Sequence, residues 1–172
     1  MLLLPLLGHS ASAQAVIFEP TPMPIVRAML ALAQVGPADV VYDLGSGDGR
    51  IPITAAQAYG ARGVGVEIDP ALIAEARVNA KKAGLADHVH FIEGNMFEAD
   101  GSGATVVTLF LHPAPNRKLR PTLLAQLKPG ARIISYIWDM GDWKPDAAQR
   151  LDNGRRIYLW RVPERKSALA ST

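Results

Sequence analysis

A glycine-rich segment directly after a short apolar stretch is the strongest constraint on how this chain can fold. Residues 43–50 read Asp-Leu-Gly-Ser-Gly-Asp-Gly-Arg, and they follow the apolar residues Val40 and Val41. Glycines at alternate positions allow the main chain to turn sharply and to approach a ligand closely, because no Cβ atom is in the way. The dinucleotide-binding fingerprint G-x-G-x-x-G would need its third glycine where Arg50 stands. We therefore expect a strand, a tight ligand-facing turn and a helix.

Strands and helices are predicted to alternate along the rest of the chain. Apolar periodicity and helix-end signals, such as Asp69 followed by Pro70, define the elements. Nearly all-apolar strands that alternate with helices indicate a parallel sheet covered on both faces. The predicted fold class is α/β, a single Rossmann-like, doubly wound, mostly parallel sheet, whose ligands bind at the carboxyl ends of the strands. Helices are expected over residues 26–33, 50–59, 70–83 and 116–127, and strands over 40–44, 63–68, 88–92, 105–111, 131–138 and 156–162.

A second acidic position supports ligand binding at this edge of the sheet. Glu67 ends the second expected strand, 24 residues after Asp43. A carboxylate at that place can accept hydrogen bonds from both hydroxyl groups of a ribose. Both residues would also be compatible with a nicotinamide dinucleotide, so an NAD-binding oxidoreductase remains an alternative.

The spacing D-x-G-x-G-x-G from Asp43 to Gly49 resembles the nucleoside-binding loop of class I S-adenosylmethionine-dependent methyltransferases. Other stretches resemble a narrower group, the small seven-strand protein-lysine methyltransferases. That group includes broad-specificity archaeal enzymes and the mitochondrial enzymes that methylate the ATP synthase c-subunit and the adenine nucleotide translocator. The resemblance spans roughly residues 16–162, and it is carried by residues 18–22, 41–51, 108–121, 127–130, 139–143 and 157–160.

This resemblance implies S-adenosylmethionine as the cofactor and a set of residues that bind it. Asn95 would read the adenine amino group after the third strand, and the neighbouring Met96 would stack on the ring. The full set of implied cofactor-binding residues is Thr21, Asp43, Gly45, Gly47, Asp48, Glu67, Asn95 and Met96. The expected reaction is direct in-line methyl transfer, and the expected acceptor is a protein lysine. A non-catalytic cofactor-binding module remains an alternative, because the acceptor region departs from the family.

The expected acceptor side carries three candidate catalytic residues, His112, Trp138 and Asp139. His112 follows the fourth strand, where this fold presents its acceptor, so it is a candidate base. Against this, the family usually has an apolar residue there, a histidine before Pro113 is also compatible with a partly exposed loop, and water could take the proton instead. Asp139 could hold a cationic lysine at the rim or be a solvated turn residue. For Asn116 we favour a helix cap over a contact with cofactor or substrate. The candidate apolar walls, which would favour a neutral amine, are Phe18, Phe110 and Trp138.

Composition and charge limit the other kinds of site. The chain has no cysteine, which excludes disulfides, Cys-ligated zinc, iron–sulfur clusters and a thiol nucleophile. His9, His88 and His90 form no metal-ligand spacing with carboxylates, so no metal is predicted. Residues 104–172 contain 12 basic and 5 acidic side chains, against 6 and 11 in residues 1–103. Without interleaved aromatic residues this basic excess favours a solvated face over nucleic-acid binding, and RNA or a small molecule remains the alternative acceptor.

The beginning of the chain predicts a separate leader. Residues 1–15 combine a leucine run with small residues in an A-x-A arrangement, which resembles a signal peptide without its positively charged start. No apolar segment is long enough for a transmembrane helix. We expect a leader over 1–15, one methyltransferase domain over 16–162 and a flexible tail over 163–172. The leader suggests export or membrane association, whereas the supply of the cofactor suggests the cytoplasm.

Overall fold

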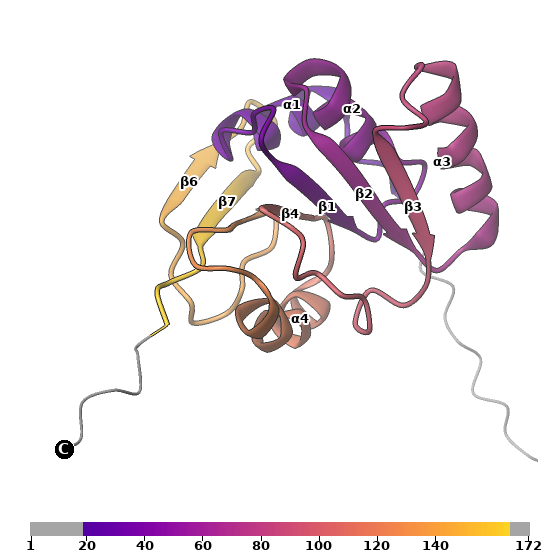
Figure 1. Cartoon of the computed structure of the whole chain (residues 1–172). Helices are drawn as coiled ribbons and strands as arrows, with labels where there is room; N and C mark the ends of the chain where they lie inside the picture. Colours follow the sequence, from indigo (N-terminus) through magenta and orange to yellow (C-terminus); the bar gives the residue numbers. More distant parts are fainter. Residues whose placement is uncertain (1–18, 166–172) are drawn as a thin grey trace, which may run out of the picture.

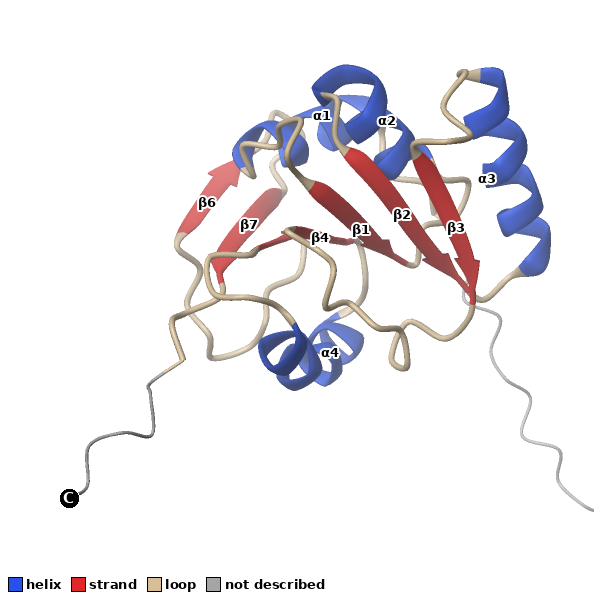
Figure 2. Ribbon diagram, viewed as in Figure 1, coloured by secondary structure: helices blue, strands red, loops and turns tan. Residues whose placement is uncertain are grey.

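The structure, a computed structural model, describes residues 19–165, which form one seven-stranded sheet and four helices (Figures 1 and 2). The helices are α1 (Met23–Leu32), α2 (Arg50–Tyr59), α3 (Pro70–Lys82) and α4 (Pro113–Gln126). The strands are β1 (Val40–Leu44), β2 (Arg62–Glu67), β3 (Val89–Glu93), β4 (Val106–Leu109), β5 (Arg132–Tyr136), β6 (Ala147–Arg150) and β7 (Arg156–Arg161). Along the sheet they lie in the order β3, β2, β1, β4, β5, β7, β6.

The sheet brings the carboxyl ends of its five parallel strands to one edge. Strands β1 to β5 run parallel, and β7 is antiparallel to both of its neighbours, β5 and β6. Leu44 at the end of β1 pairs with Val66 of β2 on one side and with Leu109 of β4 on the other. Leu109 in turn pairs with Ser135 of β5. The turns that follow β1, β2, β4 and β5 therefore lie along the same edge, and the expected Rossmann-like, mostly parallel sheet is confirmed.

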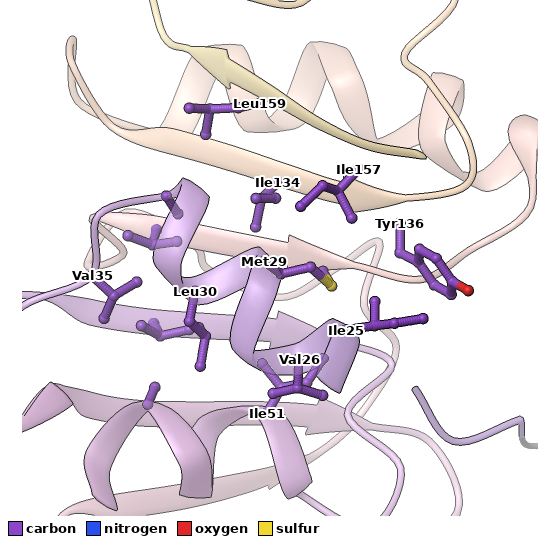
Figure 3. Close-up of a cluster of buried hydrophobic side chains, with 14 of the residues drawn as sticks. Ile25, Val26, Met29, Leu30, Val35, Ile51, Ile134, Tyr136, Ile157 and Leu159 are labelled. Atoms are coloured by element: carbon purple, nitrogen blue, oxygen red, sulfur yellow. The ribbon is translucent and has the colours of Figure 1, made fainter. Parts of the chain in front are cut away.

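Helices cover both faces of the sheet, as the apolar strands predict. Helices α1, α2 and α3 lie on one face and α4 lies on the other (Figure 2). On the α4 face, Leu119 and Leu123 of the helix pack with the fully buried Trp160 of β7. On the opposite face, a buried cluster joins α1 and α2 to strands that include β5 and β7 (Figure 3), and its members include Val26, Met29, Leu30, Ile51, Ile134, Ile157 and Leu159.

Local sequence signals account for the elements that frame the glycine-rich turn. Helix α2 has the expected bounds, and it ends at Gly60, whose φ of 69° is the left-handed conformation that glycine adopts without strain. Asp69 caps α3 as expected, because its Oδ1 accepts a hydrogen bond from the Ala71 amide at 2.8 Å. Gly60 therefore ends α2 just before β2 begins, and Asp69 starts α3 just after β2 ends.

Several boundaries differ from the expectations for physical reasons. β4 ends at Leu109, two residues before its expected end. β5 ends at Tyr136, because the next residue, Ile137, has a φ of 70°, which lies outside the extended range of a strand. Helix α4 begins at Pro113, three residues before its expected start, since a proline lacks the amide that the first turn leaves unpaired. The sequence did not predict β6, whose residues Ala-Ala-Gln-Arg are mostly exposed and show no apolar alternation.

Some expectations fall on residues that the structure does not describe. The expected leader, residues 1–15, and Phe18 lie outside the described range, as does the tail beyond residue 165. Arg165, a described residue of the expected tail, donates a hydrogen bond from Nη2 to the Ala125 carbonyl of α4 at 2.7 Å. No helix between residues 19 and 165 is long and apolar enough to cross a membrane.

Candidate functional site

The turn after β1 depends on glycine at three positions. Gly45, Gly47 and Gly49 have φ values of 84°, 52° and 80°, which residues with a side chain rarely adopt. Gly49 also has no room for a side chain, because a Cβ there would lie 2.5 Å from Phe91 Cζ. The Gly45 amide donates to the Val66 carbonyl at 2.8 Å. The turn is therefore fastened to β2 and leaves its open side facing outward from the sheet edge.

Glu67 lies at the end of β2 with its carboxylate against this turn. Its Oε2 accepts a hydrogen bond from the Gly47 amide at 3.0 Å. Its Oε1 accepts from the amides of Ile68 and Asp69 at 2.8 and 3.0 Å. The carboxylate is thus held beside the glycine turn, where we expect it to bind a ribose. Ile68 is 69% exposed directly beside it and offers an apolar surface to a flat ring, which the sequence analysis did not single out.

Asp43 is the buried acid of the site. It is 3% exposed, and its Oδ1 accepts a hydrogen bond from the Thr108 hydroxyl at 2.7 Å. Burial raises the pKa of Asp43 to about 7, the Thr108 hydrogen bond opposes this rise, and the carboxylates of Glu67 and Asp48 add to it. Three acids therefore share one small region, and a cation bound there would favour their charged forms.

Asp48 and Arg50 connect the turn to the segment before α1. Arg50 Nε and Nη2 donate to the two oxygens of Asp48 at 3.0 and 2.6 Å, which is a bidentate ion pair. Arg50 Nη1 donates to the Thr21 carbonyl at 3.0 Å. Thr21 is buried, so this contact fixes it at the site. The cavity here is lined by Thr21, Asp43, Gly45, Ser46, Asp48, Arg50, Ile51 and Phe110.

The expected adenine side lies after β3. The Gly94 amide donates to the Glu67 carbonyl at 2.9 Å, which places this loop beside the end of β2. Asn95 Oδ1 accepts from the Phe97 amide at 3.1 Å, and its Nδ2 donates to Glu98 Oε1 at 3.1 Å. Met96 is half-buried against the apolar cluster under α4. The adenine contacts of Asn95 and Met96 stay predictions.

The ends of β4 and β5 form an aromatic rim next to the cavity. Phe110 lines the cavity, and its ring lies 4.8 Å from the ring of Tyr136. His112 and Trp138 are both exposed, and their rings lie 6.1 Å apart. The side chain of Asp139 turns back on its own loop, where Oδ1 accepts from the Gly141 amide at 3.0 Å. The structure thus brings His112 and Trp138 together and leaves Asp139 as an exposed turn residue.

Asn116 does not cap α4, and the expectation of a cap was wrong. It lies within the helix, is fully buried, and its Nδ2 donates to the Ser135 hydroxyl at 3.1 Å. The same Nδ2 donates to the carbonyls of Trp138 and Asp139 at 3.1 and 3.2 Å. The N-cap position belongs to His112, whose side chain makes no capping hydrogen bond. The physical reason is that the helix starts at Pro113, which carries Asn116 inward toward β5.

Residues 43–147 match the ANTKMT methyltransferase domain, and this match covers more than half of the chain. The chain belongs to this methyltransferase family. Like the class I fold that the glycine turn suggests, this methyltransferase has the seven-stranded sheet described above. The comparison confirms the family, the fold and the enzyme class that the sequence predicts.

Two curated relatives place the methyltransferase more closely. It is 43% identical over 153 residues to the protein-lysine N-methyltransferase of Saccharolobus islandicus, a match that covers 87% of this chain and 95% of the relative. It is 34% identical over 122 residues to the adenine nucleotide translocase lysine N-methyltransferase of Mus musculus, which covers 71% of this chain. That match covers 53% of the mouse protein, so the chain spans about half the length of this relative.

A solved structure has the same fold with a ligand bound. It is described as an RNA methyltransferase from Salinibacter ruber in complex with S-adenosyl-L-homocysteine. It is 55% identical to this chain, has a TM-score of 0.83, and the match covers 89% of this chain and all of the other. This methyltransferase is accordingly S-adenosylmethionine-dependent, as the loop spacing predicts.

The residues of the site fit this cofactor. The acids Asp43, Asp48 and Glu67 suit a ligand that carries a sulfonium and an ammonium group. The Ser46 hydroxyl is buried beside the cavity and has no hydrogen-bond partner among residues 19–165. A Cβ on Gly45 would lie 3.3 Å from Leu111 Cδ2, so glycine keeps the turn clear of the segment after β4. Within the described range, no three His, Asp or Glu side chains gather closely enough to hold a metal ion.

Sequence reasoning missed several residues whose contacts are long-range. Thr108 supports Asp43 from β4, and nothing in its local sequence marks it. Gly65 of β2 is required because a Cβ there would lie 2.5 Å from Ser46 Oγ. A glycine inside an expected strand is itself a signal of close approach, so Gly65 could have been found. Asn116 was noted, but its partners lie about twenty residues further along the chain.

Proposed function

We propose that this methyltransferase transfers the methyl group of S-adenosylmethionine to the side-chain amine of a protein lysine. The observation that supports it most strongly is the 43% identity to a protein-lysine N-methyltransferase, because the match covers 95% of that relative. The cofactor supplies an activated methyl group bonded to a sulfonium, so the protein has to bind, orient and desolvate the reacting groups. The aromatic rim after β4 and β5 is the surface that we assign to the acceptor.

The main chemical requirement for such an acceptor is a neutral amine. A lysine with an ordinary pKa near ~10.4 loses its proton at pH 7 at a cost of roughly 4–5 kcal/mol. Phe110 and Trp138 would remove water from the amine, and an apolar surrounding favours its neutral form. Phe110 lines the cavity beside Asp43, and Trp138 lies further along the same edge against His112. These positions support an amine that approaches the cofactor from the side of β4 and β5.

His112 and Asp139 have weaker supporting roles in this proposal. His112 is exposed beside Trp138, so it could accept the proton that the amine releases, although water has equal access there. Asp139 has one carboxylate oxygen engaged by the Gly141 amide and is otherwise exposed, which suits a rim residue that attracts a cationic lysine before it enters. Neither residue is needed to supply a nucleophile.

RNA is the second candidate acceptor, because the 55% identical structure is described as an RNA methyltransferase. The exposed Arg117 of α4 is available for phosphate contacts. Two observations weigh against RNA. Arg120 is paired with Asp142, and Lys118 lies over the Phe97 ring at 4.1 Å. Residues 111–114 read Leu-His-Pro-Ala, without the Asn/Asp-Pro-Pro-Phe/Tyr motif of enzymes that methylate nucleic-acid amino groups.

Transfer of a radioactive methyl group in a cell lysate tests the proposal. The full-length protein is incubated with methyl-labelled S-adenosylmethionine and lysate, and samples are then treated with protease or with ribonuclease. We expect label that protease releases and ribonuclease leaves intact. Label released by ribonuclease would assign RNA instead, and no label in either fraction would support a non-catalytic binding module.

A matched pair of glycine variants shows whether the label depends on this site. Gly47→Val places a branched side chain at a φ of 52° in the turn, so it should abolish labelling. Gly36→Ala is the control, because a Cβ there meets nothing within 4 Å, and it should label as the wild type does. Equal labelling by both variants would show that a contaminating enzyme is responsible.

A further inference from the structure

The turn between β5 and the rim contains the most strained residue of the acceptor side. Ile137 has a φ of 70°, and a branched side chain is a clear outlier in this left-handed region. The Ile137 amide donates to the Arg156 carbonyl of β7 at 2.8 Å, and the Trp138 amide donates to the Tyr136 carbonyl at 2.9 Å. Strain of this kind persists only where the surrounding contacts hold it, and it gathers at functional sites.

Asn116 supplies the contacts that hold this turn from the opposite side. Its Nδ2 donates to the main-chain carbonyls of Trp138 and Asp139, which are the two residues directly after Ile137. Both carbonyls can only accept, so the amide nitrogen must face them. The Asn116 Oδ1 is buried without a hydrogen-bond partner in the described part of the chain. The Asn116 side chain is therefore oriented by the hydrogen bonds that its Nδ2 donates, and two of these go to main-chain carbonyls of the rim.

The same residue connects the two halves of the rim. Asn116 lies in the first turn of α4, four residues after His112. Its main-chain amide donates to the His112 carbonyl at 3.2 Å. The centroids of the His112 and Trp138 rings lie 6.1 Å apart, with His112 in the segment after β4 and Trp138 in the segment after β5. Ser135 at the end of β5 is fully buried and accepts the remaining contact from Asn116. A single side chain thus fixes the distance between the segment after β4 and the segment after β5.

We propose that Asn116 is a positioning residue for methyl transfer, which holds the Trp138 main chain in its strained turn and so keeps the indole against His112 where the acceptor enters. The proposal rests on the proposed placement of the acceptor at the aromatic rim, and not on whether that acceptor is a lysine. Asn116 acts through Trp138 and does not touch the reacting atoms.

The first test compares acceptor turnover with cofactor binding. The probe is total lysate protein at low concentration, so the initial rate of label transfer reports kcat/KM for the acceptor. Asn116→Ala should lower this rate by about 100-fold, the loss expected from a small misplacement of a reacting group. The Kd for S-adenosyl-L-homocysteine should change less than threefold, because the glycine turn follows β1 and Asn116 makes its hydrogen bonds with residues 135–139. Ser135→Ala is the control, since it removes one partner of Asn116 but leaves both main-chain contacts, and its rate should stay near that of the wild type.

The second test uses the strain itself. Glycine adopts the left-handed conformation freely, so a turn with Ile137→Gly should depend less on Asn116. Adding Ile137→Gly to Asn116→Ala should therefore restore activity about tenfold, whereas Ile137→Val, which keeps the branch at Cβ, should restore none. If Asn116→Ala does not fold, Asn116→Ser carries the same expectation, because its short hydroxyl cannot reach both carbonyls. Strictly additive effects would overturn the proposal.

Fluorine NMR of fluorotryptophan-labelled protein separates this proposal from the proposed function. The Trp138 resonance, assigned with Trp138→Phe, should be sharp in the wild type and broadened or shifted in Asn116→Ala, and this readout needs no acceptor. An unchanged resonance, or loss of cofactor affinity equal to the loss of activity, contradicts the positioning role. If Trp138→Ala leaves the rate of label transfer unchanged, the placement of the acceptor is wrong and the inference falls with it. If Trp138→Ala slows transfer and Asn116→Ala does not, the inference alone is wrong.

Discussion

The main-chain amide of Gly47 donates a hydrogen bond to Oε2 of Glu67 across 3.0 Å, and this contact joins the turn after β1 to the end of β2. The glycine turn and the acidic strand end are therefore one unit. Because Glu67 Oε1 is also fixed by two amides, the carboxylate is oriented before any ligand arrives. A preoriented carboxylate loses little side-chain entropy when it binds ribose hydroxyl groups.

Replacing this carboxylate with an amide should weaken cofactor binding. Glu67→Gln keeps the shape but removes the negative charge and turns one acceptor oxygen into a donor, which can accept a hydrogen bond neither from a main-chain amide nor from a ribose hydroxyl. Hydrogen bonds to charged groups contribute about 1.5–3 kcal/mol, so the Kd for S-adenosylmethionine should rise roughly 10- to 150-fold. Titration calorimetry measures this. Glu93→Gln is the control, since Glu93 is exposed on the neighbouring strand β3 and should bind as the wild type does.

Stability should fall with rising pH because of Asp43. Its folded-state pKa of about 7 exceeds the unfolded value of about 3.9, so the folded state keeps the proton to higher pH and loses stability between these two values. Asp43→Asn lacks this dependence. The free energy of unfolding of Asp43→Asn minus that of the wild type should therefore increase by about 2–3 kcal/mol from pH 5 to pH 8. Urea unfolding at both pH values checks this, and an advantage that shrinks with pH would contradict it.

Cofactor affinity should depend on pH in the opposite sense. A cationic ligand favours the charged form of Asp43, and that form becomes the major one as the pH rises through about 7. The affinity for S-adenosylmethionine should therefore increase from pH 6 to pH 8 and then level off. Calorimetry at pH 7 in two buffers of different ionisation enthalpy should show release of up to about half a proton on binding, because about half of Asp43 is protonated at this pH. No release, or proton uptake, would contradict an Asp43 that ionises when the cofactor binds.

Arg132 should matter for stability and not for the site. It pairs with Asp39 at the far end of the sheet, and its Nη1 donates to the carbonyls of Ala33 and Gln34 at 2.7 and 3.0 Å. Burial raises the pKa of Asp39, but the hydrogen bonds from Thr105 and Gly36 and the Arg132 charge outweigh it and lower the pKa. Arg132→Leu leaves this buried carboxylate unpaired, which costs about 3–5 kcal/mol.

Unfolding in urea measures that loss, and two further measurements serve as controls. Arg161→Leu changes a neighbouring exposed arginine whose contact with Gln34 is 3.5 Å, so it should stay within about 0.5 kcal/mol of the wild type. The Kd for S-adenosylmethionine of folded Arg132→Leu should be unchanged. A large loss of affinity would show that the two ends of the sheet are coupled.

A methyl group at Gly65 should disturb both packing and binding. Its Cβ would lie 2.5 Å from Ser46 Oγ and 2.7 Å from Phe91 Cδ1, so the glycine turn would have to shift. Gly65→Ala should destabilise the fold by about 1–3 kcal/mol and weaken cofactor binding. Gly36→Ala, which has open space for its Cβ, is the control for both measurements. Unchanged thermal unfolding of Gly65→Ala would show that the turn accommodates the extra atom.

The glycine turn and the strand ends around it could be predicted from the sequence because their signals are local. The glycines of the turn, Glu67 and the Asp69 cap lie within a few residues of the strand ends that position them. The helix α2 was predicted with its exact bounds for the same reason, since Gly60 marks its end. Strand β6 could not be predicted, because it is an exposed strand at the edge of the sheet that residues 19–165 form, beside β7, and it has no apolar pattern.

The acceptor side was harder to predict because its contacts are long-range. Asn116 reaches the rim only because α4 starts at Pro113, and the prolines of that segment hide the start of the helix. The left-handed turn at Ile137 has no sequence signal at all, since a branched residue is the least expected there. The candidates His112 and Trp138 were named from their places at strand ends, but their mutual contact appears only in the folded chain.

The most direct test of the account is mass spectrometry of the labelled protein acceptor from the lysate experiment, which locates the methyl group on a particular atom. Labelled acceptor made by the wild type is digested and compared with acceptor from Gly47→Val. We expect methyl groups on the Nζ atom of lysine with the wild type and none with the variant. Methyl groups found on other side chains or only on nucleotides would contradict this expectation.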